Sequence, residues 1–504
     1  MYDLIIKNAS VIDGLGNEPY IADIGIKSGK IESIGSKLSG ACETIDATGL
    51  TVTPGFIDSH SHSDRDAVAF PDQKEKIEQG ITFSITGQCG GSEAPKRLSN
   101  GDIETVEQYF SAMKQIPQGS YSGMLIGHNS LRRAVMGDEN RAPTEVELEQ
   151  MKALLRNGLE AGALGMSFGL FYIPGAYAKL DEAISLARVV AECGGILAAH
   201  LRSESDGLEE AVREYLEIIK ESGCRAVFSH HKAMWRENYG KIPRTLAMID
   251  KANADGAEVY LDVYPYSASS TTLMSRFVPG FLHPEGTKSA VSLLSDNVFC
   301  AKVKEWGNKT WGNDLSFALI TEYPANPEYE GMRVSEIAKS RGESDQYDTV
   351  LALLRESGGR GSACYFCMDE EDICQVIAHP RAMICTDSGV KGKAVKHHPR
   401  LVASFPRAIA KYVREDSVVS LPEMIRKMTS LPARVYGLEE KGIIREGMDA
   451  DLCIFDAERI TDRADYINCS LANEGLCYVI LDGKTVLENG CYNGTRAARV
   501  CTKV

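Results

Sequence analysis

The sequence predicts an α/β protein with two parts: a (β/α)8 barrel, and a small β-sandwich domain built from both ends of the chain. Three observations support this prediction. Both ends of the 504-residue chain carry short strand-like segments separated by glycines. The middle alternates apolar, strand-like runs with helix-like segments. Polar residues that suit metal binding follow several of these runs, which is where barrel enzymes place their active sites.

The two ends of the chain share one pattern. Near the N-terminus, segments rich in β-branched residues lie at residues 4–6, 22–26 and 30–34. The C-terminal end repeats this style at residues 451–455 and 477–484. Strand-rich ends around a different middle indicate one discontinuous domain. We therefore expect residues 1–52 and 438–504 to form the β-sandwich domain, and residues 53–437 to form the barrel.

The middle of the chain contains eight candidate strands, at residues 51–58, 80–87, 121–127, 162–167, 194–199, 225–229, 257–263 and 382–386. Helical stretches lie between most of them, for example at residues 144–161 and 208–222. Thr144 is a candidate N-cap, with Glu147 three residues later completing a capping box. Residues near 275–345 exceed a single crossover, so we expect an insertion beside the active face of a parallel TIM barrel.

Composition limits the classes of partner. The chain is 43% hydrophobic and 25% charged, with a net charge of −15, which argues against nucleic acid or an anionic membrane as partner. No apolar run approaches membrane-spanning length, and the start of the chain lacks the features of a signal peptide. The fourteen cysteines form no regular framework, so we expect reduced thiols and a cytoplasmic location. Composition leaves the oligomeric state open.

The first metal-binding signal is His60-Ser61-His62, which follows the candidate strand at residues 51–58. Side chains two residues apart in a strand point to the same face, so both imidazoles are able to contact one metal ion. Such a pair alone is weak, because a surface loop also contains scattered histidines.

Further candidate ligands follow other strands. Cys89 comes after the second strand, His200 ends the fifth, His230 ends the sixth and Asp387 ends the eighth. The carboxyl ends of all barrel strands meet on one face, so these residues converge with His60 and His62. Taken singly, Cys89 could be a buried thiol, His200 an interior histidine and Asp387 a turn residue.

The chain resembles the N-acyl-D-amino-acid deacylases, or D-aminoacylases, of the amidohydrolase superfamily. Blocks along nearly the whole chain carry the resemblance: Pro-Gly-Phe-Ile-Asp-Ser-His-Ser-His at 54–62, Cys-Gly at 89–90, Gly-His-Asn-Ser-Leu-Arg at 127–132, His-Leu-Arg-Ser-Glu at 200–204, Ser-His-His-Lys at 229–232, Asp-Val-Tyr-Pro-Tyr-Ser at 262–267 and His-Pro-Arg at 398–400. The histidine pair is specific only to the superfamily. The cysteine, Ser-His-His-Lys and Tyr-Pro-Tyr blocks together are specific to the deacylases.

The resemblance implies one tightly bound zinc ion held by Cys89, His200 and His230. It also implies a second, weaker metal position surrounded by His60, His62 and Asp387. Many relatives bridge two metals with a modified lysine after the fourth strand. Here that position lies near Ser167 and holds no lysine. The Cys89 thiolate would supply the negative, soft ligand instead.

The implied reaction is zinc-dependent hydrolysis of the amide bond of N-acyl-D-amino acids, or of dipeptides with a C-terminal D-residue, releasing the D-amino acid. Asp387 would accept a proton from water and donate it to the leaving amine. By the same resemblance, the α-carboxylate is bound by Lys232, Tyr264, Ser270 and Arg400. The side chain of the substrate stays open: Lys391, Lys393 and Lys396 would favour an acidic group, or are simply solvated.

Two alternatives remain. A cyclic-amide hydrolase of the hydantoinase or dihydroorotase type would carry the bridging lysine, which is absent here. A non-catalytic barrel protein would have lost metal ligands, yet all six candidates are present. In either enzyme class the expected partner is a small molecule.

Overall fold

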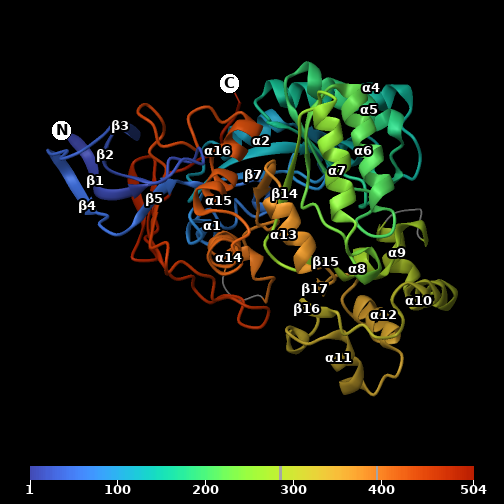
Figure 1. The fold of residues 1–504 in the computed structure, drawn as a ribbon. Coiled ribbons are helices and arrows are strands. Elements are labelled where there is room, and N and C mark those ends of the chain that lie inside the picture. Colours follow the sequence, from blue (N-terminus) through green and yellow to red (C-terminus); the bar gives the residue numbers. More distant parts are fainter. Residues whose placement is uncertain (283–286, 393–395, 504) are drawn as a thin grey trace.

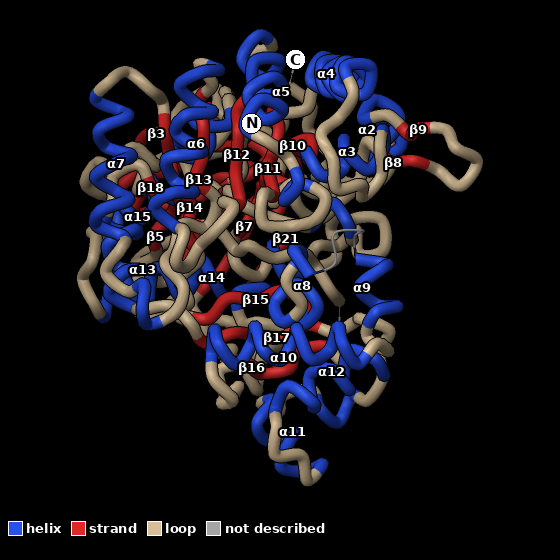
Figure 2. The backbone as a smooth tube through the Cα atoms, turned by 90° about the vertical axis from the view of Figure 1, so that its right-hand side faces the viewer, coloured by secondary structure: helices blue, strands red, loops and turns tan. Residues whose placement is uncertain are grey.

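The computed structural model describes the backbone of residues 1–282, 287–392 and 396–503 (Figure 1). Eight parallel strands form the central sheet in chain order, each beside its predecessor. They are β6 (Phe56–Asp58), β7 (Ile81–Thr86), β10 (Tyr121–Gly127), β11 (Gly165–Gly169), β12 (Ile196–His200), β13 (Arg225–Phe228), β14 (Val259–Val263) and β18 (Ala382–Ile384). Helices surround these strands, as Figure 2 shows, and the predicted barrel is confirmed.

Side chains and loops join the first and last strands of the barrel. The Asp58 carboxylate accepts hydrogen bonds from the Thr386 backbone N–H and from Lys76 Nζ, both at 2.8 Å. Lys76 and Asp58 are fully buried. Lys76 Nζ also donates to the Thr386 hydroxyl and to the Ser388 carbonyl, so all three of its protons have acceptors. This junction, called the barrel seam below, lies directly beneath two candidate ligands, since the Asp387 N–H donates to the His60 carbonyl at 2.9 Å.

Residue types at the ends of two outer helices predict where these helices begin or end. Helix α4 (Glu145–Glu160) begins at an N-cap Thr144, and the capping box with Glu147 is present as predicted. Helix α6 (Leu208–Ser222) ends at Gly223, which has a φ of 71° and so forms a left-handed C-cap. Both helices lie on the outside of the barrel (Figure 1) with α5 (Leu180–Glu192) and α7 (Ile242–Ala254).

A nine-stranded sheet combines the two ends of the chain. It contains β1 (Tyr2–Val11), β2 (Tyr20–Lys27), β3 (Lys30–Gly35), β4 (Ala41–Asp46), β5 (Thr51–Pro54), β19 (Leu452–Phe455), β20 (Leu476–Leu481), β21 (Lys484–Glu488) and β22 (Cys491–Tyr492). Strand β5 joins the halves, because it pairs with β1 on one side and β19 on the other. The β4 strand was not predicted.

The prediction of one barrel strand over residues 51–58 is wrong. The chain leaves the terminal sheet after β5 and enters the barrel at β6, with Gly55 between them. A Cβ atom at Gly55 would lie 2.3 Å from the Thr82 hydroxyl, so only glycine fits this approach to the second barrel strand. The histidine pair therefore follows the short strand β6, which ends at Asp58.

The segment between β14 and β18 adds a small subdomain beside the barrel. Its antiparallel sheet has the order β15 (Ala268–Thr272), β17 (Ser362–Phe366), β16 (Ala318–Glu322). It also contains the helices α8 (Leu273–Phe277), α9 (Thr287–Leu293), α10 (Asn297–Trp311), α11 (Val334–Arg341) and α12 (Gln346–Glu356). We call it the inserted subdomain; it lies at the lower right in Figure 1. The predicted insertion near residues 275–345 covers its middle part.

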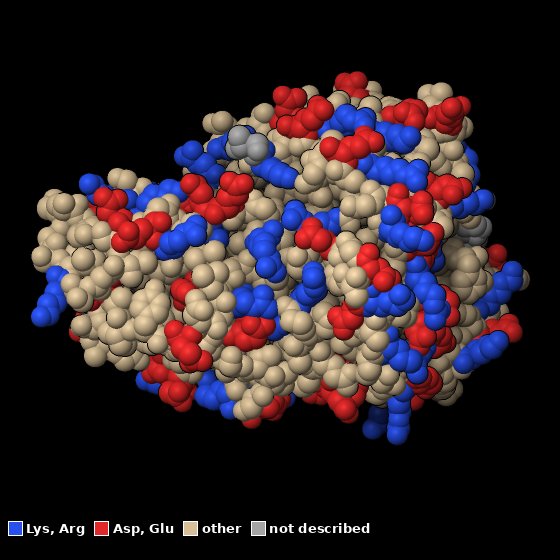
Figure 3. Space-filling model, turned by 45° about the horizontal axis from the view of Figure 1, so that its top comes forward, with Lys and Arg blue, Asp and Glu red and all other residues tan. Residues whose placement is uncertain are grey.

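Acidic and basic side chains are interspersed over the face that Figure 3 shows. That face carries no broad area of one sign, unlike the basic stripes of nucleic-acid-binding proteins. Among the described residues, no helix has the length and apolar character needed to cross a bilayer.

Candidate metal centre and active site

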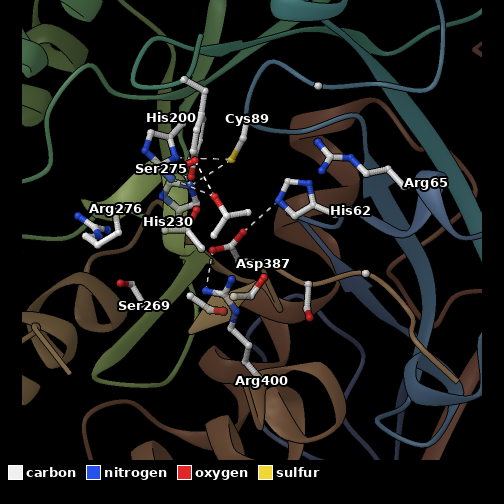
Figure 4. A pocket seen from close by; sticks show the side chains of 18 of the residues that line it. His62, Arg65, Cys89, His200, His230, Ser269, Ser275, Arg276, Asp387 and Arg400 are labelled. Carbon is white, nitrogen blue, oxygen red and sulfur yellow. Dashed lines mark hydrogen bonds and ion pairs between the residues drawn. The ribbon is translucent and has the colours of Figure 1, made fainter. Parts of the chain in front are cut away.

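The six predicted metal ligands lie together at the carboxyl ends of the barrel strands, and Figure 4 shows five of them, all except His60. His200 is the last residue of β12, and the other five follow the ends of β6, β7, β13 and β18. The Sγ atom of Cys89 is 3.3 Å from His60 Nε2, 3.3 Å from His230 Nε2 and 3.7 Å from His200 Nδ1. The ring nitrogens of His200 and His230 approach to 3.0 Å. A thiol and three imidazoles thus direct their donor atoms at one small volume.

Asp387 faces this cluster from the opposite side of the cavity. Its Oδ1 lies 3.2 Å from His62 Nε2 and 3.5 Å from His60 Nε2. Its Oδ2 forms a 2.7 Å ion pair with Arg400 Nη1. One carboxylate oxygen therefore faces the histidines and the other faces the cation.

Three of these residues have a left-handed backbone that is uncommon for residues other than glycine. The φ angle is 54° at Cys89, 36° at His230 and 47° at Asp387. Such conformations cost on the order of 1–3 kcal/mol each and cluster at functional sites. Here each one turns the chain just after a barrel strand and aims the side chain at the centre of the barrel mouth.

Electrostatics favour a thiolate in this cluster. Burial raises the pKa of Cys89, but the neighbouring His60 and His230 rings outweigh it and hold that pKa well below the usual value. Burial and Lys232 lower the pKa of His230, whereas Glu204, Cys89 and Asp387 raise it to about 9. A thiolate with imidazole nitrogens is the donor set that zinc prefers.

Glu204 is a site residue to which we assigned no role from sequence. Its Oε1 accepts a hydrogen bond from Lys232 Nζ at 2.5 Å and lies 3.0 Å from His230 Nδ1. Its Oε2 lies 3.6 Å from His200 Nε2. A carboxylate that holds the far nitrogens of two imidazoles orients them as metal ligands. The available signal was its position four residues after His200.

The four predicted carboxylate-binding residues line the same cavity of about 480 Å³ as the candidate ligands, apart from His60, which is fully buried below it. The Arg400 guanidinium stacks 4.6 Å from the centre of the Tyr264 ring. His398 supports the backbone at Arg400, because its Nδ1 accepts a hydrogen bond from the Arg400 backbone N–H while its Nε2 lies 2.9 Å from the Ala268 carbonyl. Ser270 comes from β15 of the inserted subdomain.

Lys232 is more engaged than its predicted role requires. Its ammonium contacts Glu204 Oε1, the His230 carbonyl and His230 Nδ1, at 2.5, 2.7 and 2.7 Å. Glu204 Oε1 and the His230 carbonyl accept two of its three protons; His230 Nδ1 carries its own proton when it donates to Glu204, so it does not accept the third. A substrate carboxylate would have to share Lys232 with Glu204.

The remaining histidines and lysines have other partners. His128 Nε2 lies 2.9 Å from Glu182 and His231 Nε2 lies 2.8 Å from the Thr245 hydroxyl, so both point away from the cluster. Lys391 pairs with Glu322, and Lys396 donates to a backbone carbonyl. Lys393 lies outside the described residues.

Comparison with known proteins places this geometry in a family. The model of the amidohydrolase family matches residues 43–293 and 378–487. An N-acyl-D-glutamate deacylase of Alcaligenes xylosoxydans xylosoxydans is 37% identical, over 96% of this chain and 93% of that protein. A D-aminoacylase of the same organism is 33% identical, over 100% of this chain and 98% of that protein.

A solved structure extends the likeness to three dimensions. The N-acyl-D-glutamate deacylase of Bordetella bronchiseptica, in complex with zinc and a phosphonate inhibitor, is 35% identical and superimposes with a TM-score of 0.86 over 99% of each chain. These matches confirm the resemblance predicted from the sequence blocks. The chain belongs to the amidohydrolase family.

Proposed function

We propose that this protein is a zinc-dependent deacylase that hydrolyses the amide bond of N-acyl-D-amino acids, or of dipeptides with a C-terminal D-residue. One observation carries the proposal: the Cys89–His200–His230 cluster faces Asp387 and Arg400 across a single cavity. This arrangement suits a metal-assisted attack on a carbonyl next to a bound anion. The names of the similar proteins support the same substrate class.

The donor atoms fit zinc. Cys89, His200 and His230 would hold the tightly bound ion, and His60, His62 and Asp387 would surround a second, weaker position. At the place where many relatives carry a bridging lysine, Ser167 donates a hydrogen bond to the Gly87 carbonyl at 2.5 Å and accepts one from the Gly90 N–H at 3.0 Å. Ser167 thus braces the loop of Cys89 from both sides, which supports a thiolate-based centre.

Bound zinc would polarise the acyl carbonyl and lower the pKa of water from about 16 to about 7. Asp387 supplies the proton transfers. Burial raises its pKa, but Arg400, His230 and His62 outweigh that effect, so the carboxyl stays ionised and is able to accept a proton from water. As the carbon–nitrogen bond breaks, Asp387 donates that proton to the amine nitrogen, so that the leaving group departs as a neutral amine.

The α-carboxylate of the substrate would bind to Arg400, with Lys232, Tyr264 and Ser270 around it. Arginine suits this role because its planar fork matches a carboxylate. When the carbonyl and the α-carboxylate of the substrate are both held in place, D- and L-substrates point their side chains in different directions within the cavity. We therefore expect a strong preference for D-substrates.

The alternatives find less support. A cyclic-amide hydrolase lacks its bridging lysine here, since Ser167 occupies that region. A non-catalytic protein would have no need for three strained backbone positions at the donor cluster.

All fourteen cysteines are free in the structure, which supports the expectation of a reducing, cytoplasmic environment.

A substrate screen tests the proposal. Zinc-loaded protein should hydrolyse N-acetyl-D-amino acids or L-D dipeptides at least 100-fold faster than the matching L-compounds. Treatment with a chelator should abolish this activity, and added zinc should restore it. Equal turnover of L-substrates, or full activity without metal, would contradict the proposal. Hydantoin and dihydroorotate serve as probes for the cyclic-amide alternative.

A further inference from the structure

A second group of reactive side chains lies outside the candidate active site. It borders a cavity of about 460 Å³ whose lining includes Cys469 and Ser470. The charged residues in that lining are Glu330 and Lys396, and Lys396 Nζ donates to the Ile467 carbonyl at 2.5 Å. This cavity and the candidate active-site cavity have no lining residue in common. The proposed deacylase reaction therefore makes no use of the group.

Cys469 is associated with a histidine and a hydroxyl. The His397 backbone N–H donates a hydrogen bond to Cys469 Sγ at 3.4 Å. The Nε2 atom of the same histidine lies 3.4 Å from the Ser470 hydroxyl, and that hydroxyl lies 4.0 Å from Cys469 Sγ. A thiol, a hydroxyl and an imidazole thus meet at the wall of one cavity.

The orientation of the His397 ring makes it a base toward this group. Its Nδ1 atom lies 3.0 Å from the His398 carbonyl oxygen, which only accepts hydrogen bonds, so Nδ1 carries the proton. In the neutral ring, Nε2 then has a lone pair that is able to accept a proton. Both histidines are buried, which keeps the ring in this position. A thiol beside a base that a third group orients is the arrangement of an activated nucleophile.

Electrostatics agree with this geometry. Burial raises the pKa of the Cys469 thiol, but hydrogen bonds from the side chain and backbone of His397, together with the charge of its ring, outweigh burial and lower that pKa to about 7. Burial raises the pKa of two other buried thiols instead, to about 11 at Cys224 and about 12 at Cys453. About half of the Cys469 thiols are therefore ionised at neutral pH.

We propose that Cys469 is a modification site: a thiol that His397 activates and that hydrogen peroxide and other small electrophiles reach through the cavity. With peroxide, His397 Nε2 takes the thiol proton and the sulfur attacks one peroxide oxygen. A sulfur–oxygen bond forms as the oxygen–oxygen bond breaks, and the leaving hydroxide takes the proton from the imidazolium and departs as water. The sulfur is oxidised by two electrons to a sulfenic acid, and the peroxide is reduced. Only 4% of Cys469 is exposed, so the reagent has to be small.

The test is limited alkylation of the folded, zinc-loaded protein with iodoacetamide, with each labelled cysteine identified by peptide mass spectrometry. The exposed thiols Cys42 and Cys491 serve as internal references. At pH 6, Cys469 should react about 5-fold faster than either, because about 30-fold more thiolate is offset by about 5-fold lower nucleophilicity. The rate at Cys469 should be half-maximal near pH 7, whereas an ordinary thiol reaches this point near pH 8.5.

Two histidine variants identify the base. His397→Gln should move the midpoint at Cys469 toward pH 8.5 and remove its advantage at pH 6. His379→Gln is the matched control, because His379 is a similarly buried histidine that pairs with Asp250, and its profile should stay unchanged. After brief treatment with hydrogen peroxide, the sulfenic-acid reagent dimedone should label Cys469 first in wild-type protein and not in His397→Gln.

Three outcomes would overturn the inference. They are labelling of Cys469 no faster than that of Cys42 and Cys491 at pH 6, a profile that His397→Gln leaves unchanged, and an equal shift in His379→Gln. The wild-type profile decides the first point even if a variant fails to fold. These assays read the thiols alone, so their result is independent of the substrate screen for deacylase activity.

Discussion

The two walls of the active-site cavity are built differently. One wall comes from the ends of barrel strands, and its donor atoms are closely packed: Cys89 and His200 contact His230, and Asp387 contacts His60 and His62. The other wall comes from the inserted subdomain. It presents the hydroxyls of Ser269, Ser270 and Ser275 and the Arg276 guanidinium, which has no carboxylate partner among the described residues. The barrel wall holds groups fixed for chemistry, whereas the inserted wall adds hydroxyl and cationic groups that line the cavity.

This difference has a structural cause. Strand ends in a parallel barrel are held by hydrogen-bonded ladders on both sides, so residues there keep fixed positions. The inserted wall rests on strand β15, which pairs only with β17, and on the five-residue helix α8. We therefore expect substitutions in the barrel wall to affect metal binding and kcat, and those in the inserted wall to affect selectivity.

The largest effect should follow Cys89→Ala. Loss of the thiolate removes the only soft, anionic ligand of the proposed tight site, so most bound zinc and nearly all activity should disappear while the protein stays folded. Metal analysis after gel filtration measures this. Cys453→Ala, which removes a buried thiol from the terminal sheet, is the control and should keep its zinc. Normal zinc content in Cys89→Ala would remove this residue from the site.

The second-largest effect is expected for Asp387→Asn. It should retain the tightly held zinc and lose kcat by about 100-fold or more, the size expected when a general acid–base group is deleted. Steady-state kinetics and metal content are measured on the same preparation. If zinc and activity fall together, Asp387 acts mainly as a ligand.

Glu204→Gln tests whether the barrel wall depends on support behind the ligands. The amide keeps the size of the side chain and loses the charge facing Lys232 and His230. Metal affinity should fall by about 10- to 100-fold, as is typical when a partner of a ligating histidine is changed. Competition with a chromogenic chelator measures this affinity. An unchanged affinity would mean that Glu204 serves only to hold Lys232.

Arg400→Met changes a residue at the boundary of the two walls. Loss of a charge-assisted hydrogen bond of roughly 1.5–3 kcal/mol should raise KM by about 10- to 100-fold. The variant should also discriminate poorly between a free acid and its methyl ester. A normal KM together with a normal preference for the acid would refute the proposed role in carboxylate binding.

Ser270→Ala should have the smallest effect. A neutral hydrogen bond contributes about 0.5–1.5 kcal/mol, so KM should rise by about 2- to 12-fold with kcat unchanged. A larger loss in kcat than in KM would show that the inserted wall takes part in chemistry, which would break the contrast drawn between the two walls.

The barrel wall was more predictable from sequence than the inserted wall. Apolar runs flanked by helix signals indicate parallel strands, and a polar residue after such a run reaches the barrel mouth by topology alone. His230 was found in this way. The split between β5 and β6 could not be predicted from sequence. It depends on how closely Gly55 approaches Thr82, a contact that local sequence patterns do not reveal.

The surroundings of Arg276 could not be predicted, because they depend on contacts between segments that are distant in the sequence. In the same way, a sequence gives no sign that Lys232, Arg400 and Lys391 would each pair with a carboxylate. The aromatic residues around Arg276, which are Phe171, Trp235 and Tyr365, come from three separate segments of the chain. Glu204 was nearer to prediction, since it shares a sequence block with His200.

The barrel seam has a consequence for biosynthesis. The hydrogen bond from the Thr386 backbone to Asp58 joins residues 328 positions apart. At a synthesis rate of about 5–20 residues per second, Asp58 waits about 15–65 s before its partner leaves the ribosome. During that interval the edge of β6 opposite β7 lacks the residues of the barrel seam that cover it in the folded protein, which is a hazard for aggregation. A nascent chain that stops before residue 382 would carry five of the six candidate ligands without β18, the last strand of the barrel.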